Sequence, residues 1–262
     1  MELTYKFLSN IRSPHSTEII PFNPAFVQTT AHSKILYELT VDSGRILSNK
    51  GQHGYYEIYT KIFDPLRNNQ LTIVELGIGS IKDSTPSTMY HFHKNLPLKG
   101  LQYFPGGSLK LWQKYFRNQN NRYFGWDIDI DDAMIEGASL LTVDTRDIVS
   151  TRKTLARTMG SLNNTGESCI DIFIDDGLHT YESQMSVFST VFPRIRRGGY
   201  YIIEDTGVPS QEYDRDTGIF LQSNIKQFLL ANEISRICSL RPDMYQFCEY
   251  DTPAGMIVVQ KP

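Results

Sequence analysis

The fold of this chain is indicated most clearly by residues 170–179, which read IDIFIDDGLH. A short apolar run rich in isoleucine ends there in two carboxylates, a glycine and a histidine. Such a run is typical of a buried parallel strand, whose charged end would lie at the carboxyl edge of a sheet. Open α/β sheets bind their ligands at that edge. The stretch therefore predicts a strand that delivers acidic groups and a histidine to a binding site.

A second stretch of the sequence has the same pattern. Residues 200–205 read YYIIED, again an apolar run that ends in an acidic pair. Two strands of this kind would bring several carboxylates around one point. Such a cluster is costly unless a cation, a shared proton or a base role accounts for it.

Strands alternate with helices along the middle of the chain, which indicates a doubly wound, mostly parallel sheet with Rossmann-like topology. The predicted strands are 72–77, 123–129, 139–144, 170–174 and 200–203, and the helices among them are 107–117, 147–160, 180–195 and 217–232. Strand-like segments follow at 236–240, 244–250 and 255–260. No helix separates the last two, so we expect a C-terminal antiparallel hairpin in a seven-stranded α/β sheet.

The domain organisation expected is a short cap followed by one large domain. Residues 1–65 are weakly patterned, with a helix near 31–41 and a second ending near Leu66, and we expect them to form a helical N-terminal cap or entry segment. Residues 66–262 would form the ligand-binding domain. A long polar and aromatic insert at about 80–105 interrupts it, and is either an active-site lid or a disordered surface loop.

Composition excludes several classes of protein. The 262 residues are 40% hydrophobic and carry a formal charge of -3, so nothing favours nucleic-acid binding. The basic group Arg194, Arg196 and Arg197 is expected to be a solvated helix end. The three cysteines lack metal-ligand spacing and are expected to be reduced thiols. With neither an apolar leader nor a run of about 20 apolar residues, the sequence predicts a cytoplasmic protein without a membrane span.

A nucleoside cofactor is indicated by the first strand and its neighbours. Gly77 and Gly79 follow the first strand, where glycine lets the backbone approach a ligand closely. Glu75, Asp127 and Asp144 lie at the ends of three successive strands, and their carboxylates can accept hydrogen bonds from ribose hydroxyls and an adenine amine. A compact phosphate-binding turn is missing, which favours S-adenosylmethionine over a dinucleotide. The alternative is an ordinary turn between a strand and a helix.

The acidic strand ends predict a metal site. Asp175, Asp176, Glu204 and Asp205 offer the carboxylate oxygens that Mg²⁺ prefers. His179 follows closely enough to reach the same site, where it could take a proton from a hydroxyl. The alternative is that an aspartate here caps the next helix. Two acidic pairs together with a histidine favour the metal site.

These motifs together resemble a known family. They include NKG at 49–51 with HGY at 53–55 and Tyr59, LGIG at 76–79, GGSLKLW at 106–112, GWDI at 125–128, DDG at 175–177 with His179, and IED at 203–205. The combination resembles the class I S-adenosylmethionine-dependent, Mg²⁺-dependent sugar O-methyltransferases of macrolide biosynthesis, the group of mycinamicin VI 2''-O-methyltransferase and demethylmacrocin O-methyltransferase. The resemblance runs from about residue 48 to 205. Leu178 and Ser183 depart from the usual serine and histidine of that group.

The resemblance implies a role for each matched residue. It implies Asp176, Glu204 and Asp205 as ligands of Mg²⁺, and His179 as the general base, with Asp176 also acting in catalysis. The predicted cofactor-binding residues are Glu75, Gly77, Gly79, Ser108, Asp127, Asp144 and Asp175.

We therefore predict methyl transfer from S-adenosylmethionine to a hydroxyl of a sugar or glycoside, with Mg²⁺ orienting the acceptor. The nearest alternative is a metal-dependent O-methyltransferase with a catechol-type or other small-molecule acceptor. An NAD-dependent oxidoreductase would need the missing phosphate turn, and a non-catalytic module would be expected to have a broken acidic cluster. The cap and the insert are common places for subunit contacts, so a homo-oligomer is also considered.

Overall fold

The computed structural model describes most of the central part of the chain and isolated segments at its ends. The described residues are 18–21, 33–39, 41–42, 45–51, 53–82, 102–163, 168–206, 213–214, 219–220, 230, 233–234, 246–251 and 255–261. The predicted insert at 80–105 lies largely outside them, as do the strand predicted at 236–240 and most of the helix predicted at 217–232.

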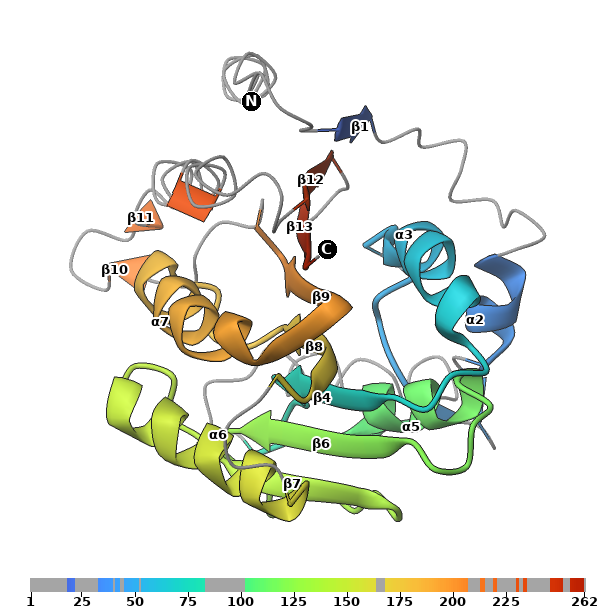
Figure 1. The fold of residues 1–262 in the computed structure, drawn as a ribbon, viewed down its shortest axis with the longest axis horizontal. Helices are drawn as coiled ribbons and strands as arrows, with labels where there is room; N and C mark the ends of the chain where they lie inside the picture. The colour runs from blue at the N-terminus through green and yellow to red at the C-terminus, as the bar shows by residue number, and fades with distance from the viewer. Residues whose placement is uncertain are drawn as a thin grey trace.

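Among the described residues, eight strands form a mixed sheet at the centre of the molecule (Figure 1). Five strands are parallel: β7 (Ala138–Thr142), β6 (Arg122–Asp127), β4 (Thr72–Leu76), β8 (Ile170–Asp175) and β9 (Ile195–Glu204). Next to β9 lies the antiparallel hairpin of β13 (Met256–Gln260) and β12 (Gln246–Asp251), which confirms the predicted hairpin. The predicted count of seven strands is wrong, because β1 (Glu18–Pro21) pairs with β12 as an eighth.

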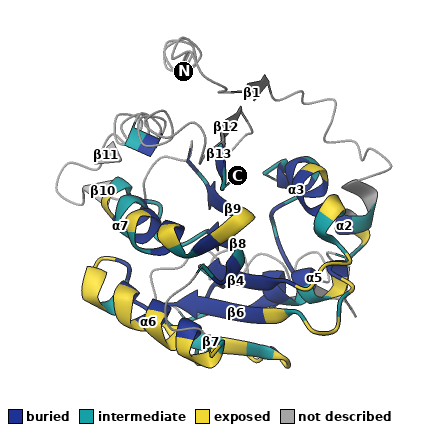
Figure 2. Ribbon diagram, in the orientation of Figure 1, coloured by how far each residue is buried: buried dark blue, intermediate teal, exposed yellow. Residues whose placement is uncertain are grey.

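Helices cover both faces of the sheet (Figure 1). On one side, α2 (Ser33–Leu39), α3 (Tyr55–Phe63) and α5 (Gly107–Tyr115) contribute to a core with residues of β4 and β8. On the other side, α6 (Ile148–Ser161) and α7 (Tyr181–Val191) pack over a second core. The central strands β4, β6 and β8 are buried almost throughout, whereas β7 at the edge of the sheet and the outer surface of α6 are more exposed (Figure 2). The boundary between a cap of 1–65 and the rest stays a prediction, although α2 and α3 share their core with the sheet.

Two predicted helices differ from the structure at residues that it describes. The helix predicted over 180–195 ends at Val191, and a 3-10 turn follows at Phe192–Arg194. Pro193 cannot donate the backbone hydrogen bond that continuation would need. Ile219–Phe220, placed in a predicted helix, instead pairs as β11 with β10 (Tyr213–Asp214), as suits a β-branched and an aromatic residue.

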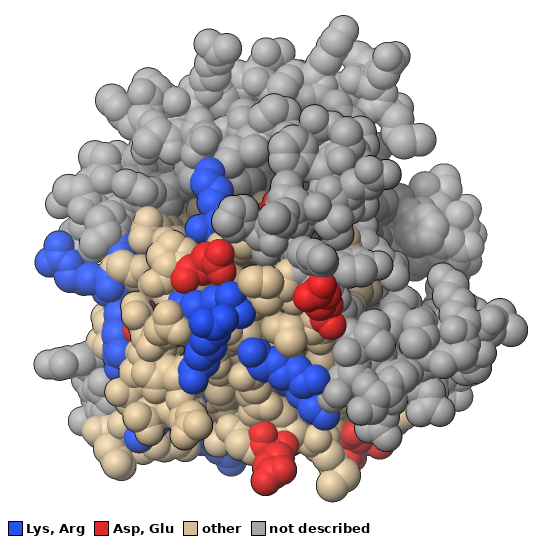
Figure 3. Space-filling model, turned by 90° about the vertical axis from the view of Figure 1, so that its right-hand side faces the viewer, with Lys and Arg blue, Asp and Glu red and all other residues tan. Residues whose placement is uncertain are grey.

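The described surface carries charged side chains of both signs. Basic and acidic side chains are interspersed among the described residues of the face in Figure 3. The expected solvated helix end at Arg194, Arg196 and Arg197 is wrong in part, since the last two lie in β9. Arg196 Nη1 is 3.3 Å from Asp171 Oδ1, so this guanidinium is paired. No helix in the described part of the chain combines the length and apolar character of a membrane span.

The start of α6 provides a modest stability prediction. Asp147 precedes this helix, and its side chain accepts a hydrogen bond of 2.8 Å from Val149 N. Replacing this cap by alanine leaves a helix-terminal N–H without its partner, so Asp147→Ala is expected to destabilise the protein by about 1 kcal/mol. Urea unfolding measures the change. Asp147→Asn, which keeps a capping oxygen, should unfold at nearly the wild-type concentration.

Candidate active site

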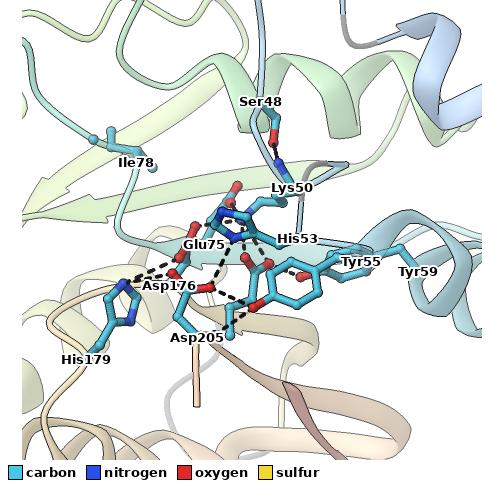
Figure 4. Close-up of polar contacts among 12 residues, drawn as sticks. Ser48, Lys50, His53, Tyr55, Tyr59, Glu75, Ile78, Asp176, His179 and Asp205 are labelled. Atoms are coloured by element: carbon cyan, nitrogen blue, oxygen red, sulfur yellow. Dashed lines mark hydrogen bonds and ion pairs between the residues drawn. The ribbon is translucent and has the colours of Figure 1, made fainter. Parts of the chain in front are cut away.

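The candidate site lies where β4, β8 and β9 end side by side. Leu76 is the register partner of Asp175, and Asp175 is the partner of Ile203, so the residues that follow these strands meet at one edge. The structure brings together Asp176, His179, Glu204 and Asp205, four residues of the predicted acidic cluster. It adds Glu75, which the sequence analysis assigned to cofactor binding. Figure 4 shows the labelled groups among them converging with side chains from the N-terminal segment.

Lys50 occupies the centre of this cluster (Figure 4). Its Nζ lies 2.6 Å from Asp176 Oδ2, 2.8 Å from Glu204 Oε2 and 3.2 Å from Glu75 Oε1. The side chain is 2% exposed, so its charge is taken almost entirely out of water. Burial lowers the pKa of the ammonium, but the surrounding carboxylates outweigh this and raise it well above its ordinary value. Lys50 therefore stays charged, and the sequence analysis assigned it no role.

Asp205 is held by a separate set of contacts. Tyr55 Oη donates a hydrogen bond of 2.6 Å to Asp205 Oδ1 and accepts one of 2.9 Å from Asp205 N. His53 Nδ1 lies 3.2 Å from the same carboxylate oxygen. Asp205 has a φ of 56°, a left-handed conformation that costs energy in a residue other than glycine. Tyr55 thus anchors both the backbone and the carboxylate of a strained residue.

Three side chains form a compact group that could hold a metal ion. One ligand atom each from Asp176, His179 and Asp205 can be chosen so that all three lie within 4.8 Å of one another. His179 Nε2 is 3.4 Å from Asp205 Oδ2 and 3.8 Å from Asp176 Oδ1. Burial raises the pKa of Asp205, but the hydrogen bond from His53 and the charge of His179 lower it to about 2. The carboxylates of Asp176 and Asp205 provide the oxygen ligands that a hard divalent cation prefers.

Glu204 adjoins this group but is engaged elsewhere. Its carboxylate accepts hydrogen bonds from Lys50 and from the hydroxyl of Tyr59, and it is 1% exposed. Its predicted role as a metal ligand stays a prediction.

The glycine loop after β4 lies directly against the acidic cluster. Gly77 has a φ of 86°, and a Cβ there would be 1.7 Å from the carbonyl oxygen of Asp176. Only glycine allows this approach. Gly79 N donates a hydrogen bond of 2.9 Å to Asp127 Oδ2, so the loop also holds the predicted ribose-binding acid. The glycine loop, Asp127 and Asp176 therefore form one continuous edge.

Glu75 and Ser108 are buried partners within the site. Trp112 Nε1 donates a hydrogen bond of 3.0 Å to Glu75 Oε2, while Lys50 lies at the other oxygen. Burial raises the pKa of Glu75, and the charge of Lys50 and a hydrogen bond from Ser108 oppose the increase. These contacts occupy Glu75 with protein groups.

Two predicted cofactor residues have their partners outside the cluster. Asp144 is partly exposed and paired with Arg146, whose hydrogen bonds lower the pKa of the carboxylate. Asp175 is buried and accepts a hydrogen bond of 2.9 Å from Tyr201, a member of the core on the α6–α7 side. Burial raises the pKa of Asp175 to about 6. Strand alternation explains the separation from Asp176, since successive side chains take opposite faces.

Sequence reasoning also missed the hydroxyl partners of the acidic groups. Tyr55 and Tyr59 project from α3 toward Asp205 and Glu204 (Figure 4). The signal was present in the HGY motif and in Tyr59, four residues further on, because residues four apart lie on one face of a helix.

Comparisons with known proteins agree with this arrangement. No family model matches the chain. Over 158 residues, or 59% of the chain, it is 34% identical to an 8-demethyl-8-alpha-L-rhamnosyl tetracenomycin-C 2'-O-methyltransferase of Streptomyces olivaceus. It is 28% identical over 58% of its length to mycinamicin VI 2''-O-methyltransferase of Micromonospora griseorubida. The matches cover 34% and 31% of those relatives, so the chain spans about a third of their length.

Solved structures show the same fold. The MycE methyltransferase from the mycinamycin biosynthetic pathway, in complex with Mg and SAH, matches 90% of this chain and 55% of its own length, with a TM-score of 0.55 and 22% identity. A second crystal form of that complex gives a TM-score of 0.56 at 19% identity, with 90% of this chain and 54% of that chain covered. The resemblance predicted from the motifs is confirmed: this chain has the α/β methyltransferase fold, and its curated relatives are sugar O-methyltransferases.

Proposed function

We propose that this chain transfers a methyl group from S-adenosylmethionine to a hydroxyl of a sugar or glycoside, with the help of Mg²⁺. The observation that carries the proposal is the contact between the glycine loop and the acidic cluster. The loop holds the ribose-binding candidate Asp127, and its neighbour Leu76 accepts a hydrogen bond of 2.9 Å from Asp176 N. A nucleoside cofactor on the loop would therefore lie beside the groups that handle the acceptor.

The cluster suits a hard cation, and Asp176 and Asp205 are the residues proposed to hold it. Bound there, Mg²⁺ would lower the pKa of an acceptor hydroxyl and hold vicinal hydroxyls in a defined orientation. Glu204 would be a third ligand if it released one of its hydrogen bonds, as the sequence predicts.

His179 is the proposed proton acceptor. Its imidazole lies beside Asp176 and Asp205, within reach of a hydroxyl held by those carboxylates. S-adenosylmethionine bound on the glycine loop would supply the methyl group: its carbon–sulfur bond would break as the carbon–oxygen bond formed, and the hydroxyl proton would pass to His179. S-adenosylhomocysteine leaves as a neutral thioether. Asp205 stabilises the imidazolium that results.

The direct test combines the protein with Mg²⁺, methyl-labelled S-adenosylmethionine and a rhamnosylated polyketide, and follows label into the product. Matched reactions contain the aglycone, a catechol or NAD with a secondary alcohol. We expect methylation of the glycoside alone, and none in EDTA. Transfer to the catechol would favour the alternative acceptor class. If calorimetry detects no binding of S-adenosylmethionine, the proposal is wrong. The cytoplasmic location and the homo-oligomer remain predictions.

The two acids predicted to bind the cofactor can be separated experimentally. Asp127 is nearly buried and accepts a hydrogen bond from Gly79 N, whereas Asp144 is partly exposed beside Arg146. Loss of a hydrogen bond to a charged group costs about 1.5–3 kcal/mol, so Asp127→Ala should weaken S-adenosylhomocysteine binding roughly 10- to 100-fold. Asp144→Ala should have the smaller effect, because Arg146 already occupies its carboxylate. Calorimetric titration compares them, and equal losses would contradict this ranking.

A further inference from the structure

Lys50 is the buried cation around which the acidic site is built. Within the described residues its ammonium contacts one carboxylate from each of three strand ends: Glu75 of β4, Asp176 after β8 and Glu204 of β9. These acids are 0%, 22% and 1% exposed, so two of them cannot be neutralised by water or surface counterions. One positive charge thus faces three carboxylates that the sheet forces together.

We propose that Lys50 is a positioning residue that acts as a permanent internal cation, holding the carboxylates of the site in place when no metal is bound. The inference rests on the proposed function for its metal site. In this proposal the carboxylate oxygens of the site are divided between two cations, the Lys50 ammonium and the metal ion. Lys50 engages Glu204 and Asp176 Oδ2, while Asp176 Oδ1 and Asp205 Oδ2 face His179 and remain on the side of the compact group.

The geometry explains why such a device is useful. Carboxylates packed this closely repel one another, and burial further disfavours their charged forms. A divalent ion alone could offset this repulsion. When the ion left, however, the carboxylates would move apart or take up protons. A lysine tethered through Ser48–Lys50 on the N-terminal side cannot leave, and Lys50 N donates a hydrogen bond of 3.1 Å to Ser48 Oγ. Asp176, one of the proposed metal ligands, is therefore held in place before a metal binds.

The test replaces Lys50 by methionine, which keeps most of the length of the side chain and removes the ammonium group. Breaking a buried charge network by removing one partner is strongly destabilising, so the Tm of Lys50→Met in EDTA should fall by about 10 °C. Saturating Mg²⁺ should recover a large part of that loss, since a ligand that binds only the folded state stabilises it. Mg²⁺ should raise the Tm of the wild type much less.

Two controls distinguish a positioning role from general damage. Lys82→Met makes the same change at an accessible lysine that contacts Asp129 and Asp131, and its Tm should stay near the wild-type value with or without Mg²⁺. The double variant Lys50→Met with Glu204→Gln removes one charge of each sign, so it should regain stability in EDTA relative to Lys50→Met. It also gives a readout if Lys50→Met alone does not fold.

A wild-type Tm for Lys50→Met in EDTA would overturn the inference. So would a loss that neither Mg²⁺ nor Glu204→Gln reduces. Calorimetric titration of the wild type with Mg²⁺ separates this outcome from failure of the proposed function. If no Mg²⁺ binds, the metal-dependent reaction fails, whereas recovery of Lys50→Met by Glu204→Gln would still establish Lys50 as the internal cation.

Discussion

Replacing His179 by alanine is expected to lower kcat by about 10²–10⁴-fold, the contribution typical of a positioned general base. Histidine is the commonest general base in enzymes, and His179 lies in the compact group with Asp176 and Asp205. In the proposed reaction it lies on the acceptor side of the site, whereas the glycine loop and Asp127 lie on the cofactor side. Binding of S-adenosylhomocysteine should therefore change little, and single-turnover kinetics with calorimetry would measure the two effects.

The substitution Asp176→Asn tests the proposed role of this carboxylate as a metal ligand. The substitution keeps the shape of the side chain and removes the charge shared between Lys50 and the compact group. We expect a comparable loss of turnover together with weaker Mg²⁺ binding. Asp147→Asn is the matched control, because that residue only caps α6 and asparagine caps a helix equally well. Wild-type turnover in both His179→Ala and Asp176→Asn would refute the assigned roles.

Gly77→Ala is expected to disrupt both the fold at this edge and cofactor binding. A Cβ at this position would be 1.7 Å from the carbonyl oxygen of Asp176, which is backbone and cannot rotate away. The φ of 86° adds a cost of about 1–3 kcal/mol for a residue other than glycine. Relief of the clash requires the loops after β4 and β8 to separate. We therefore expect a lower Tm and loss of measurable S-adenosylhomocysteine binding.

Gly160→Ala provides the matched control for this substitution. Gly160 lies in α6, and a Cβ there would meet nothing within 4 Å. Alanine is favoured over glycine in a helix by about 0.5–1 kcal/mol, so this variant should be slightly more stable than the wild type. If Gly77→Ala has the same Tm and the same cofactor affinity as Gly160→Ala, the loops after β4 and β8 are not in the contact described above.

The sequence by itself was enough to locate the elements that carry the site. Apolar runs ending in acids identified β4, β6, β8 and β9, and the lack of a helix between the last two strands identified the hairpin. These predictions succeed because burial on both faces imposes a continuous apolar run, and because parallel strands must end at one edge. The eighth strand escaped because β1 belongs to a weakly patterned segment, and its pairing with β12 joins opposite ends of the chain.

Only the tertiary structure decided which charges meet. Lys50 lies 126 residues from Asp176 and 154 from Glu204 in the chain, and no local pattern encodes such a pairing. Asp175 and Asp176 are adjacent in sequence. Asp175 nevertheless accepts a hydrogen bond from Tyr201 in a core, whereas Asp176 faces the site. Local sequence determines where strands run and where their acidic ends fall. The partner of each buried charge depends on how distant segments pack, because a charge removed from water is stabilised only by the groups that the fold places beside it.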